Sequence, residues 1–294
     1  MEVVPAAALA VVPSRAADFV ELTKPRITAL VLVTAAVGYA VGGQGSFHPS
    51  AFLVFLAGTA LLCGGASTLN QYMERDADAR MVRTSRRPIP AGRLRPEEAL
   101  AFGLVLSAAG LLMLSFVNLL TVALGAASLL SYVLAYTPLK RVTSLCTVVG
   151  AVPGALPPLM GWAAARGELG APGWGLFAIL FLWQLPHFLA IGWLYRDDYA
   201  RGGFPMLAVM DPDGSASGRQ ALLYTTALLP VTLAAGVLAA AGTGYLWGAL
   251  AMGVVFLICA ALFAWKRSAG TARRLFLVSV LYLPALLGLM VFDR

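Results

Sequence analysis

Nine long apolar segments divide this chain of 294 residues. A helix needs about 20 apolar residues to cross the hydrocarbon layer of a bilayer. The composition agrees, because 60% of the residues are apolar and only 12% are charged, which excludes an ordinary soluble protein, a disordered chain and a secreted disulfide scaffold. We predict an all-α polytopic membrane protein with nine transmembrane helices around a central intramembrane pocket. The predicted spans are 27–43, 51–71, 98–116, 118–136, 145–165, 173–195, 219–241, 244–265 and 274–292.

Basic residues are divided very unequally between the two sets of loops that these spans create. Of the 21 Lys and Arg residues, 19 lie on the side of the N-terminus, and only Arg166 and Arg294 lie on the other side. The positive-inside rule therefore places the N-terminus in the cytoplasm and the C-terminus outside. The net charge of +7 is then mainly a topology signal, so we expect the lipid bilayer, and no nucleic acid, as a partner.

Residues 1–26 lack the pattern of a cleavable signal and are poor in Arg for a mitochondrial transit peptide. We therefore expect a cytoplasmic N-terminal segment, 1–26, followed by a single transmembrane domain, 27–294, in a bacterial plasma membrane. The three cysteines fall inside apolar runs without a Cys-x-x-Cys spacing, so they indicate neither a disulfide framework nor a zinc site.

Two cytoplasmic loops hold an unusual share of the acidic residues. The chain has only 14 acidic residues, and five of them gather in these loops: Glu74, Asp76, Asp78, Asp197 and Asp198. Asn70, Glu74 and Asp78 are spaced four apart and share one helical stripe. Hard divalent ions such as Mg²⁺ take such oxygen ligands, together with substrate phosphates. Asp76 faces elsewhere and is placed to pair with Arg80, and the alternative for the whole cluster is a solvated helix end with ordinary ion pairs.

Basic residues follow both the first acidic loop and the fourth span. Arg offers a fork that matches phosphate oxygens, and Lys offers a point charge. Carboxylates with such neighbours describe a site for a metal-bridged diphosphate, although the pair that closes span four also fits a role as topology anchors. The candidate diphosphate ligands are Arg83, Arg87, Lys140 and Arg141, with Tyr136 as a secondary candidate.

His187 is the only histidine within a predicted span. An ionisable residue at that depth is expensive and indicates a functional site. Imidazole is a common haem ligand, but a hydrogen bond between helices, or exposure to a watery pocket beside Pro186, explains the residue equally well. Span five contains Pro153, Pro157 and Pro158, and we expect it to be too broken for a plain helix and to line the pocket.

Several motifs together resemble the UbiA-type intramembrane prenyltransferases, and within them the branch that attaches farnesyl to protohaem. The likeness covers residues 20–210, and beyond 219 it is only generic apolar helix. The motifs are Leu22-Thr-Lys24-Pro25-Arg26, Asn70-x-x-x-Glu74-x-x-x-Asp78, Arg83-Thr84-x-x-Arg87-Pro88, Tyr136-Thr-Pro-Leu-Lys140-Arg141, Gly154-Ala-Leu-Pro157-Pro158, Trp183-Gln184-x-Pro186-His187-Phe188 and Asp198-Tyr199-x-x-Gly202-Gly203.

The resemblance implies transfer of farnesyl from farnesyl diphosphate to a vinyl group of haem B, which is a substrate and not a cofactor. It implies Mg²⁺ held by Asn70, Glu74, Asp78 and Asp198, with Asp78, Asp198 and Lys140 as catalytic residues. It also implies haem contacts from His187 and Trp183, and a downstream haem A synthase or oxidase assembly factors as candidate partners.

Two departures from the family pattern concern the acidic residues. Glu74 stands where the family usually has Asp, and Asp197 and Asp198 are adjacent where relatives space two Asp four apart. Asp198 matches the pattern better, so Asp197 and Asp76 are secondary candidates. A prenyltransferase for a quinone or a chlorin acceptor is the first alternative. A secondary transporter for an anionic solute is the second, although the chain shows no convincing inverted repeat.

Overall fold

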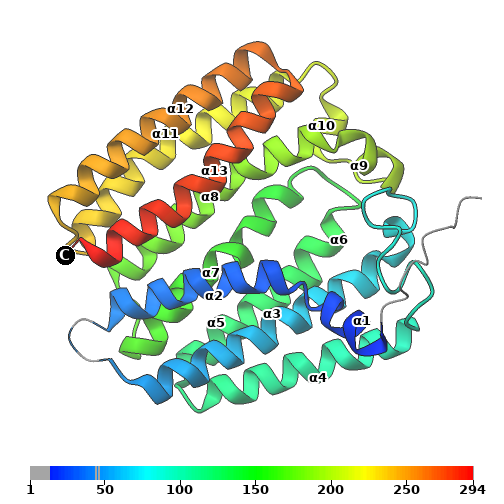
Figure 1. Ribbon diagram of the computed structural model, residues 1–294, viewed down its shortest axis with the longest axis horizontal. Coiled ribbons are helices and arrows are strands. Elements are labelled where there is room, and N and C mark those ends of the chain that lie inside the picture. Colours follow the sequence, from blue (N-terminus) through cyan, green and yellow to red (C-terminus); the bar gives the residue numbers. More distant parts are fainter. Residues whose placement is uncertain (1–13, 44, 46, 294) are drawn as a thin grey trace, which may run out of the picture.

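The computed structural model describes residues 14–43, 45 and 47–293 (Figure 1). The predicted N-terminal segment up to residue 13, and Arg294, lie outside the described residues. The helical elements are α1 Arg15–Leu22, α2 Pro25–Gly42, α3 Pro49–Asp78, α4 Pro96–Ser115, α5 Leu119–Leu130, the π-helix η1 Ser131–Tyr136, α6 Thr137–Leu139, α7 Cys146–Arg166, α8 Ala171–Leu194, α9 Arg196–Gly202, α10 Leu207–Met210, α11 Ser215–Leu238, α12 Thr243–Lys266 and α13 Ala269–Phe292.

The prediction of nine membrane-spanning helices is confirmed for the described residues. The protein is therefore a multi-pass membrane protein. The main difference lies in α3, which has 30 residues and continues past the predicted end of its span to Asp78. Because the helix continues through Glu74 and Asp76 to Asp78, the first acidic cluster is part of a helix instead of a loop.

The long helices form one bundle with α7 and α8 near its centre (Figure 1). Helices α11, α12 and α13 lie on one side, and α2, α3, α4 and α5 lie on the other. Of the first group, α11 and α13 pack on α8, and α12 packs on α11 and α13. Large buried rings such as Phe256 and Tyr282 fill the first half, and Tyr39 and Phe55 fill the second. The two largest apolar clusters of the bundle therefore occupy its two halves, and two smaller ones accompany them.

Helices α2 and α7 approach closely enough that their backbones touch. A Cβ added at Gly38 would lie 1.9 Å from the carbonyl oxygen of Pro158, and one added at Gly161 would lie 2.0 Å from that of Ala35. Small residues at such crossings let membrane helices gain contact through van der Waals packing. The glycines therefore fix how near α2, which follows Lys24, comes to the centre of the bundle.

Helix α7 contains Pro153, Pro157 and Pro158 and still runs unbroken from Cys146 to Arg166. The prediction that this span is too broken for a plain helix is wrong. Pro157 has no N–H to donate to the carbonyl of Pro153, four residues earlier, and the hydroxyl of Ser128 on α5 donates to that carbonyl at 3.2 Å. Packing in a helical bundle tolerates internal prolines because neighbouring helices satisfy the freed carbonyls.

One end of the bundle, here called the charged end, is where α3 and α8 finish and α4 begins. The short helix α1 is fastened there by Asp18, which is 2% exposed and accepts from Arg93 Nε at 2.8 Å. This contact joins α1 to the loop between α3 and α4, so both segments pack together at the charged end.

Candidate active site

Three oxygen-bearing side chains line the last turns of α3 at the charged end. Asn70 and Glu74 are each 2% exposed, and Asp78 is fully buried. The predicted stripe is therefore a continuous helical face, and it points into protein. A solvated helix end, which was the alternative for this cluster, does not describe these three side chains.

Each member of the stripe contacts a cation from a different part of the chain. Lys24 Nζ lies 3.2 Å from Asn70 Oδ1, and Lys140 Nζ lies 2.8 Å and 2.9 Å from the two carboxylate oxygens of Glu74. Arg87 Nη1 lies 2.6 Å from Asp78 Oδ2. We call these six residues the ion-pair cluster. It brings together the start of α2, the end of α3, the loop after α3 and the end of α6.

The two lysines of the cluster differ in how far a neighbouring carboxylate offsets the effect of burial on their pKa. Burial and, to a smaller extent, the nearby Arg87 charge lower the pKa of Lys24, and Glu74 opposes both, so that the pKa is about 8. Burial also lowers the pKa of Lys140, but the Glu74 carboxylate outweighs this effect and leaves it above its ordinary value. Lys24 therefore lacks a full counter-charge, because its partner Asn70 is neutral, and an added anion would be stabilised beside it.

Asp78 is only half satisfied. Its Oδ1 atom is buried and has no hydrogen-bond partner, while its backbone carbonyl accepts from the Thr84 hydroxyl at 2.9 Å. A buried carboxylate oxygen without a donor is costly, so this atom is a natural ligand for a cation. Among the described residues, no three His, Cys, Asp or Glu side chains converge as a complete metal-binding group. A metal bound to Asp78 would take its further ligands from other oxygens, such as those of amides, water or a bound molecule.

Asp198 holds the loop that follows α3. Its Oδ1 accepts from the Val82 amide at 2.9 Å and from Arg201 at 2.5 Å, and its Oδ2 accepts from the Arg83 amide at 3.1 Å. Burial raises the pKa of Asp198, but the hydrogen bonds from Arg201 and the two amides outweigh it and leave the pKa below its usual range. The carboxylate therefore fixes the path of the segment that carries Arg87 into the cluster.

The remaining predicted polar residues lie at the rim or outside the cluster. Asp76 is exposed and its nearest cation is Arg75, at 3.8 Å, so the predicted pairing with Arg80 is wrong. Arg80 instead donates to the Gly202 carbonyl at 2.9 Å, because the turn after α3 directs it towards α9. Asp197 is also exposed, with only Arg196 nearby at 3.8 Å.

Two of the predicted diphosphate ligands are exposed arginines. Arg83 stacks over the rings of Tyr195 and Tyr199, at 5.5 Å and 5.9 Å from their centres. Arg141 donates to the carbonyl of Met73 on α3 at 2.7 Å. Both lie at the charged end, but neither has its guanidinium inside the cluster. Arg87 and Lys140 are the members of the predicted set that the fold brings to the acidic stripe.

A π-helical turn stands beside the stripe. Thr137, which follows η1 as the first residue of α6, donates to the carbonyl of Tyr132 in η1 and accepts from Asn70 Nδ2 at 3.1 Å. The ring of Tyr136 lies 5.5 Å from Lys140 Nζ, and a Cβ at Gly150 would meet that ring at 2.5 Å. Single π-turns inside α-helices frequently mark functional sites, and this one orients both Asn70 and Lys140.

His187 lies on α8, away from the cluster, and faces α13. Its Nδ1 is 2.7 Å from the hydroxyl of Ser279, and its ring stacks on Trp183 with centres 5.0 Å apart. The Trp183 indole N–H donates to the Ser279 carbonyl at 2.8 Å. The hydrogen bond between helices, which was one explanation of this histidine, is therefore present. It uses only one of the two ring nitrogens.

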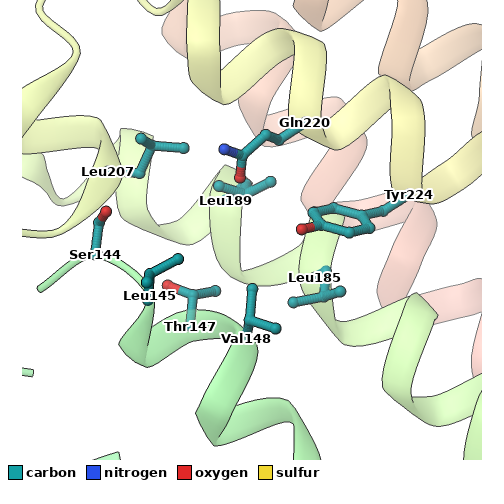
Figure 2. Close-up of a pocket in the computed structure, with 9 residues that line it drawn as sticks. All are labelled: Ser144, Leu145, Thr147, Val148, Leu185, Leu189, Leu207, Gln220 and Tyr224. Atoms are coloured by element: carbon teal, nitrogen blue, oxygen red, sulfur yellow. The ribbon is translucent and has the colours of Figure 1, made fainter. Parts of the chain in front are cut away.

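A small cavity lies between α7, α8, α10 and α11, as Figure 2 shows. It holds about 70 Å³, and its polar side chains are Ser144, Thr147, Gln220 and Tyr224. None of the residues that line it is charged. It therefore lacks the groups that could hold a diphosphate, and the ion-pair cluster is the better candidate for chemistry.

Three residues of the site were not singled out as site residues by their sequence. Lys24 occurs in a quoted motif, but only the fold shows that its side chain reaches Asn70. Thr137 also occurs in a quoted motif, whereas Ser279 lies outside all of them. Neither hydroxyl indicates a distant partner by itself, because a hydroxyl inside an apolar span commonly bonds to its own helix. Their partners lie 67 and 92 residues away along the chain.

The sequence of this chain matches a known protein family over most of its length. The family model described as the UbiA prenyltransferase family matches residues 31–283. A protein from Solibacter usitatus named protoheme IX farnesyltransferase is 47% identical over 290 residues, covering 94% of this chain and 98% of that protein. A protein of the same name from Myxococcus xanthus is 46% identical, covering 96% of each chain.

Solved structures of similar fold are much more distant in sequence. A structure described for a digeranylgeranylglyceryl phosphate synthase has a TM-score of 0.81 at 16% identity and covers 95% of this chain and 98% of its own. A UbiA homologue from Archaeoglobus fulgidus bound to GPP and Mg²⁺ has a TM-score of 0.66 at 13% identity, with 93% and 99% covered. These likenesses show that the nine-helix arrangement is a shared fold.

Proposed function

This chain belongs to the UbiA prenyltransferase family, and from this premise we propose that it transfers farnesyl from farnesyl diphosphate to a vinyl group of haem B. The products are haem O and diphosphate, and haem O serves the assembly of haem–copper oxidases. The names of the relatives support the choice of both substrates. One structural observation supports the reaction type: a buried stripe of oxygen ligands whose members each contact a separate cation.

The proposed Mg²⁺–diphosphate site uses Asn70, Glu74 and Asp78, with Asp198 as the fourth ligand. The unpartnered Oδ1 of Asp78 supports this assignment. Asp198 Oδ2 has one donor and therefore retains acceptor capacity. When bound, the metal neutralises negative charge on the leaving diphosphate as a Lewis acid. A solved UbiA homologue is bound to GPP and Mg²⁺, which fits a site that takes part of its ligands from the substrate.

The basic residues of the cluster bind the diphosphate in this proposal. Lys24, Lys140 and Arg87 are already held within hydrogen-bonding distance of the stripe. They therefore need little reorganisation to stabilise the charge that develops as the diphosphate leaves. Arg83 and Arg141, which lie at the rim, attract the diphosphate before it enters, and Asp78, Asp198 and Lys140 are the residues closest to the chemistry.

The reaction breaks the bond between C1 of the farnesyl chain and the diphosphate oxygen, and the electron pair leaves with the diphosphate. The terminal carbon of the haem vinyl group then forms a bond to the allylic cation. Water adds to the resulting carbocation beside the porphyrin and loses a proton, which gives the hydroxyl group of the product. Apolar side chains around the farnesyl chain exclude water until the carbon–carbon bond has formed.

His187 and Trp183 form the haem contact in this proposal. Their stacked rings on α8 offer an aromatic surface and one ring nitrogen without a partner among the described residues. We expect His187→Asn and His187→Gln both to weaken haem binding and to leave the affinity for farnesyl diphosphate nearly intact, because the diphosphate site uses other residues. Unaltered haem titration in His187→Ala with reduced protein stability would show that the residue is only structural.

We propose that the charged end faces the cytoplasm of a bacterium, with the C-terminus outside. The distribution of Lys and Arg between the loops supports this orientation, and the organisms of the relatives support a bacterial plasma membrane. A downstream haem A synthase, or an oxidase assembly factor, is the proposed partner, because the apolar product stays in the membrane.

The deciding experiment is product analysis by pigment chromatography. The purified chain in detergent receives haem B, farnesyl diphosphate and Mg²⁺, and we expect haem O and released diphosphate, both lost when the metal is chelated. Prenylation of a quinone precursor or a chlorin, with haem B unchanged, would instead identify a sibling activity. No conversion of any acceptor, together with uptake of an anionic solute into vesicles, would identify a transporter.

A further inference from the structure

Ser279 on α13 makes three hydrogen bonds that together constrain the imidazole of His187. Its hydroxyl oxygen lies 2.6 Å from the carbonyl of Phe276 and 2.7 Å from His187 Nδ1, and its own carbonyl accepts from the Trp183 indole. The serine therefore stands between a carbonyl that can only accept and a ring nitrogen that can do either. The distribution of one hydroxyl proton decides the state of the histidine.

The carbonyl of Phe276 has no proton, so the short contact with it requires the Ser279 hydroxyl to donate. A hydroxyl has a single proton, and the same oxygen can then only accept from His187. The proton of the neutral imidazole must therefore sit on Nδ1, and Nε2 carries a free lone pair. An imidazolium, with protons on both nitrogens, is disfavoured because a charged group within a membrane span is expensive.

The ring is also held in position by aromatic neighbours. Trp183 stacks on the imidazole at 5.0 Å with an interplanar angle of 23°, and the ring of Phe276 lies at 5.1 Å with an angle of 32°. Trp183 is itself tied to α13 through its indole N–H. Rotation of the imidazole would break the serine contact and both ring contacts, so the direction of Nε2 is determined by α8 and α13 together.

We propose that Ser279 is a positioning residue that locks His187 in the Nδ1–H tautomer and presents Nε2 as a ligand for the iron of haem. This inference rests on the proposed function, because it uses haem as the acceptor. Histidines that bind metals almost always donate their other N–H to a fixed acceptor, which sets the tautomer and raises the basicity of the ligating nitrogen. Among the described residues, Nε2 has no such competing partner.

The tautomer can be measured without haem. The chain contains only two histidines, so His48→Asn leaves a single ¹⁵N-histidine signal set in detergent. We expect Nδ1 to show the shift of a protonated nitrogen and Nε2 that of an unprotonated one. Ser279→Ala should mix or reverse the two tautomers, and Ser279→Thr, which keeps the hydroxyl, should restore the original pattern. A protonated Nε2 in the parent chain, or no change in Ser279→Ala, would overturn the inference.

Haem titration separates this inference from the proposed function. With ferric haem B as the probe, we expect a histidine-dependent absorption change and an affinity about three- to tenfold weaker in Ser279→Ala, which is the effect of one neutral hydrogen bond. Farnesyl diphosphate affinity should not change. A locked tautomer with identical haem titrations in the parent and His187→Ala would overturn the haem-ligand role, whereas an unlocked tautomer overturns the role of Ser279 whatever the haem affinity.

Discussion

Replacing Asp78 by Asn tests the central claim about the stripe with the smallest change of shape. Asp78 is fully buried, one of its oxygens is 2.6 Å from Arg87, and the other has no partner. The amide can still accept from Arg87, but its NH₂ group then occupies the unpartnered position. There it would face the metal with a donor in place of a negative charge.

The expected loss follows from the role of the group. Removing one preorganised charge-stabilising group from an active site costs about 10²- to 10³-fold in turnover, or about 2.7–4 kcal/mol of transition-state stabilisation. The matched control is Asp76→Asn on the same helix, because the Asp76 side chain is 72% exposed and its nearest cation is 3.8 Å away. An exposed ion pair of this kind contributes about 0–1 kcal/mol to stability, so we expect activity within about twofold of the parent.

The assay is release of diphosphate and formation of farnesylated haem, measured across a Mg²⁺ titration at equal amounts of folded protein. Asp78→Asn should need more Mg²⁺ for half-maximal rate, and Asp76→Asn should follow the parent curve. Thermal unfolding of both variants controls for misfolding. Equal losses in two variants that unfold at the parent temperature would refute the argument that the buried stripe, and not the local charge, holds the metal.

Three further outcomes follow from other parts of the molecule. Ser85→Cys, in the loop after α3 and in a variant whose native cysteines are replaced, should react with a membrane-impermeant thiol reagent only in inverted vesicles. Labelling in intact cells would show that the orientation is the opposite of the one proposed. Gly161→Ala should lower the free energy of unfolding by about 1–3 kcal/mol, because its Cβ would lie 2.0 Å from the Ala35 carbonyl. Gly288→Ala on α13, which meets no atom within 4 Å, should stay neutral or raise the melting temperature; equal loss in both refutes the close-packing argument. Arg93→Gln should lower the free energy of unfolding by about 1–3 kcal/mol and speed proteolysis near α1, because buried Asp18 loses its partner. Arg95→Gln, whose parent side chain is 79% exposed, should do neither. Unchanged cleavage in Arg93→Gln would show that other contacts hold α1.

The sequence alone determined the number of spans and the acidic stripe. Both depend on local regularities: the length of apolar runs, which the bilayer thickness sets, and a four-residue spacing, which the helix repeat sets. The motifs around Asp78 and His187 were also sufficient to identify the family, because they are short and contiguous in the chain.

Only the tertiary structure decided which cation meets which oxygen. Lys24 and Lys140 reach Asn70 and Glu74 across 46 and 66 residues of chain, and no local rule contains such pairings. The unbroken path of α7 depends in the same way on Ser128 of a neighbouring helix.

The absence of long-range contacts from local sequence rules also explains the wrong pairing predicted for Asp76 and the incomplete prediction for His187. An i to i+4 spacing predicts an ion pair only while the helix continues, and α3 ends at Asp78. Arg80 therefore lies outside the helix, and its side chain donates to the Gly202 carbonyl. The tautomer of His187 depends on a serine 92 residues away and on a carbonyl one turn before that serine. A sequence fixes which groups are present, whereas the position of a proton depends on the neighbours that folding brings within 3 Å.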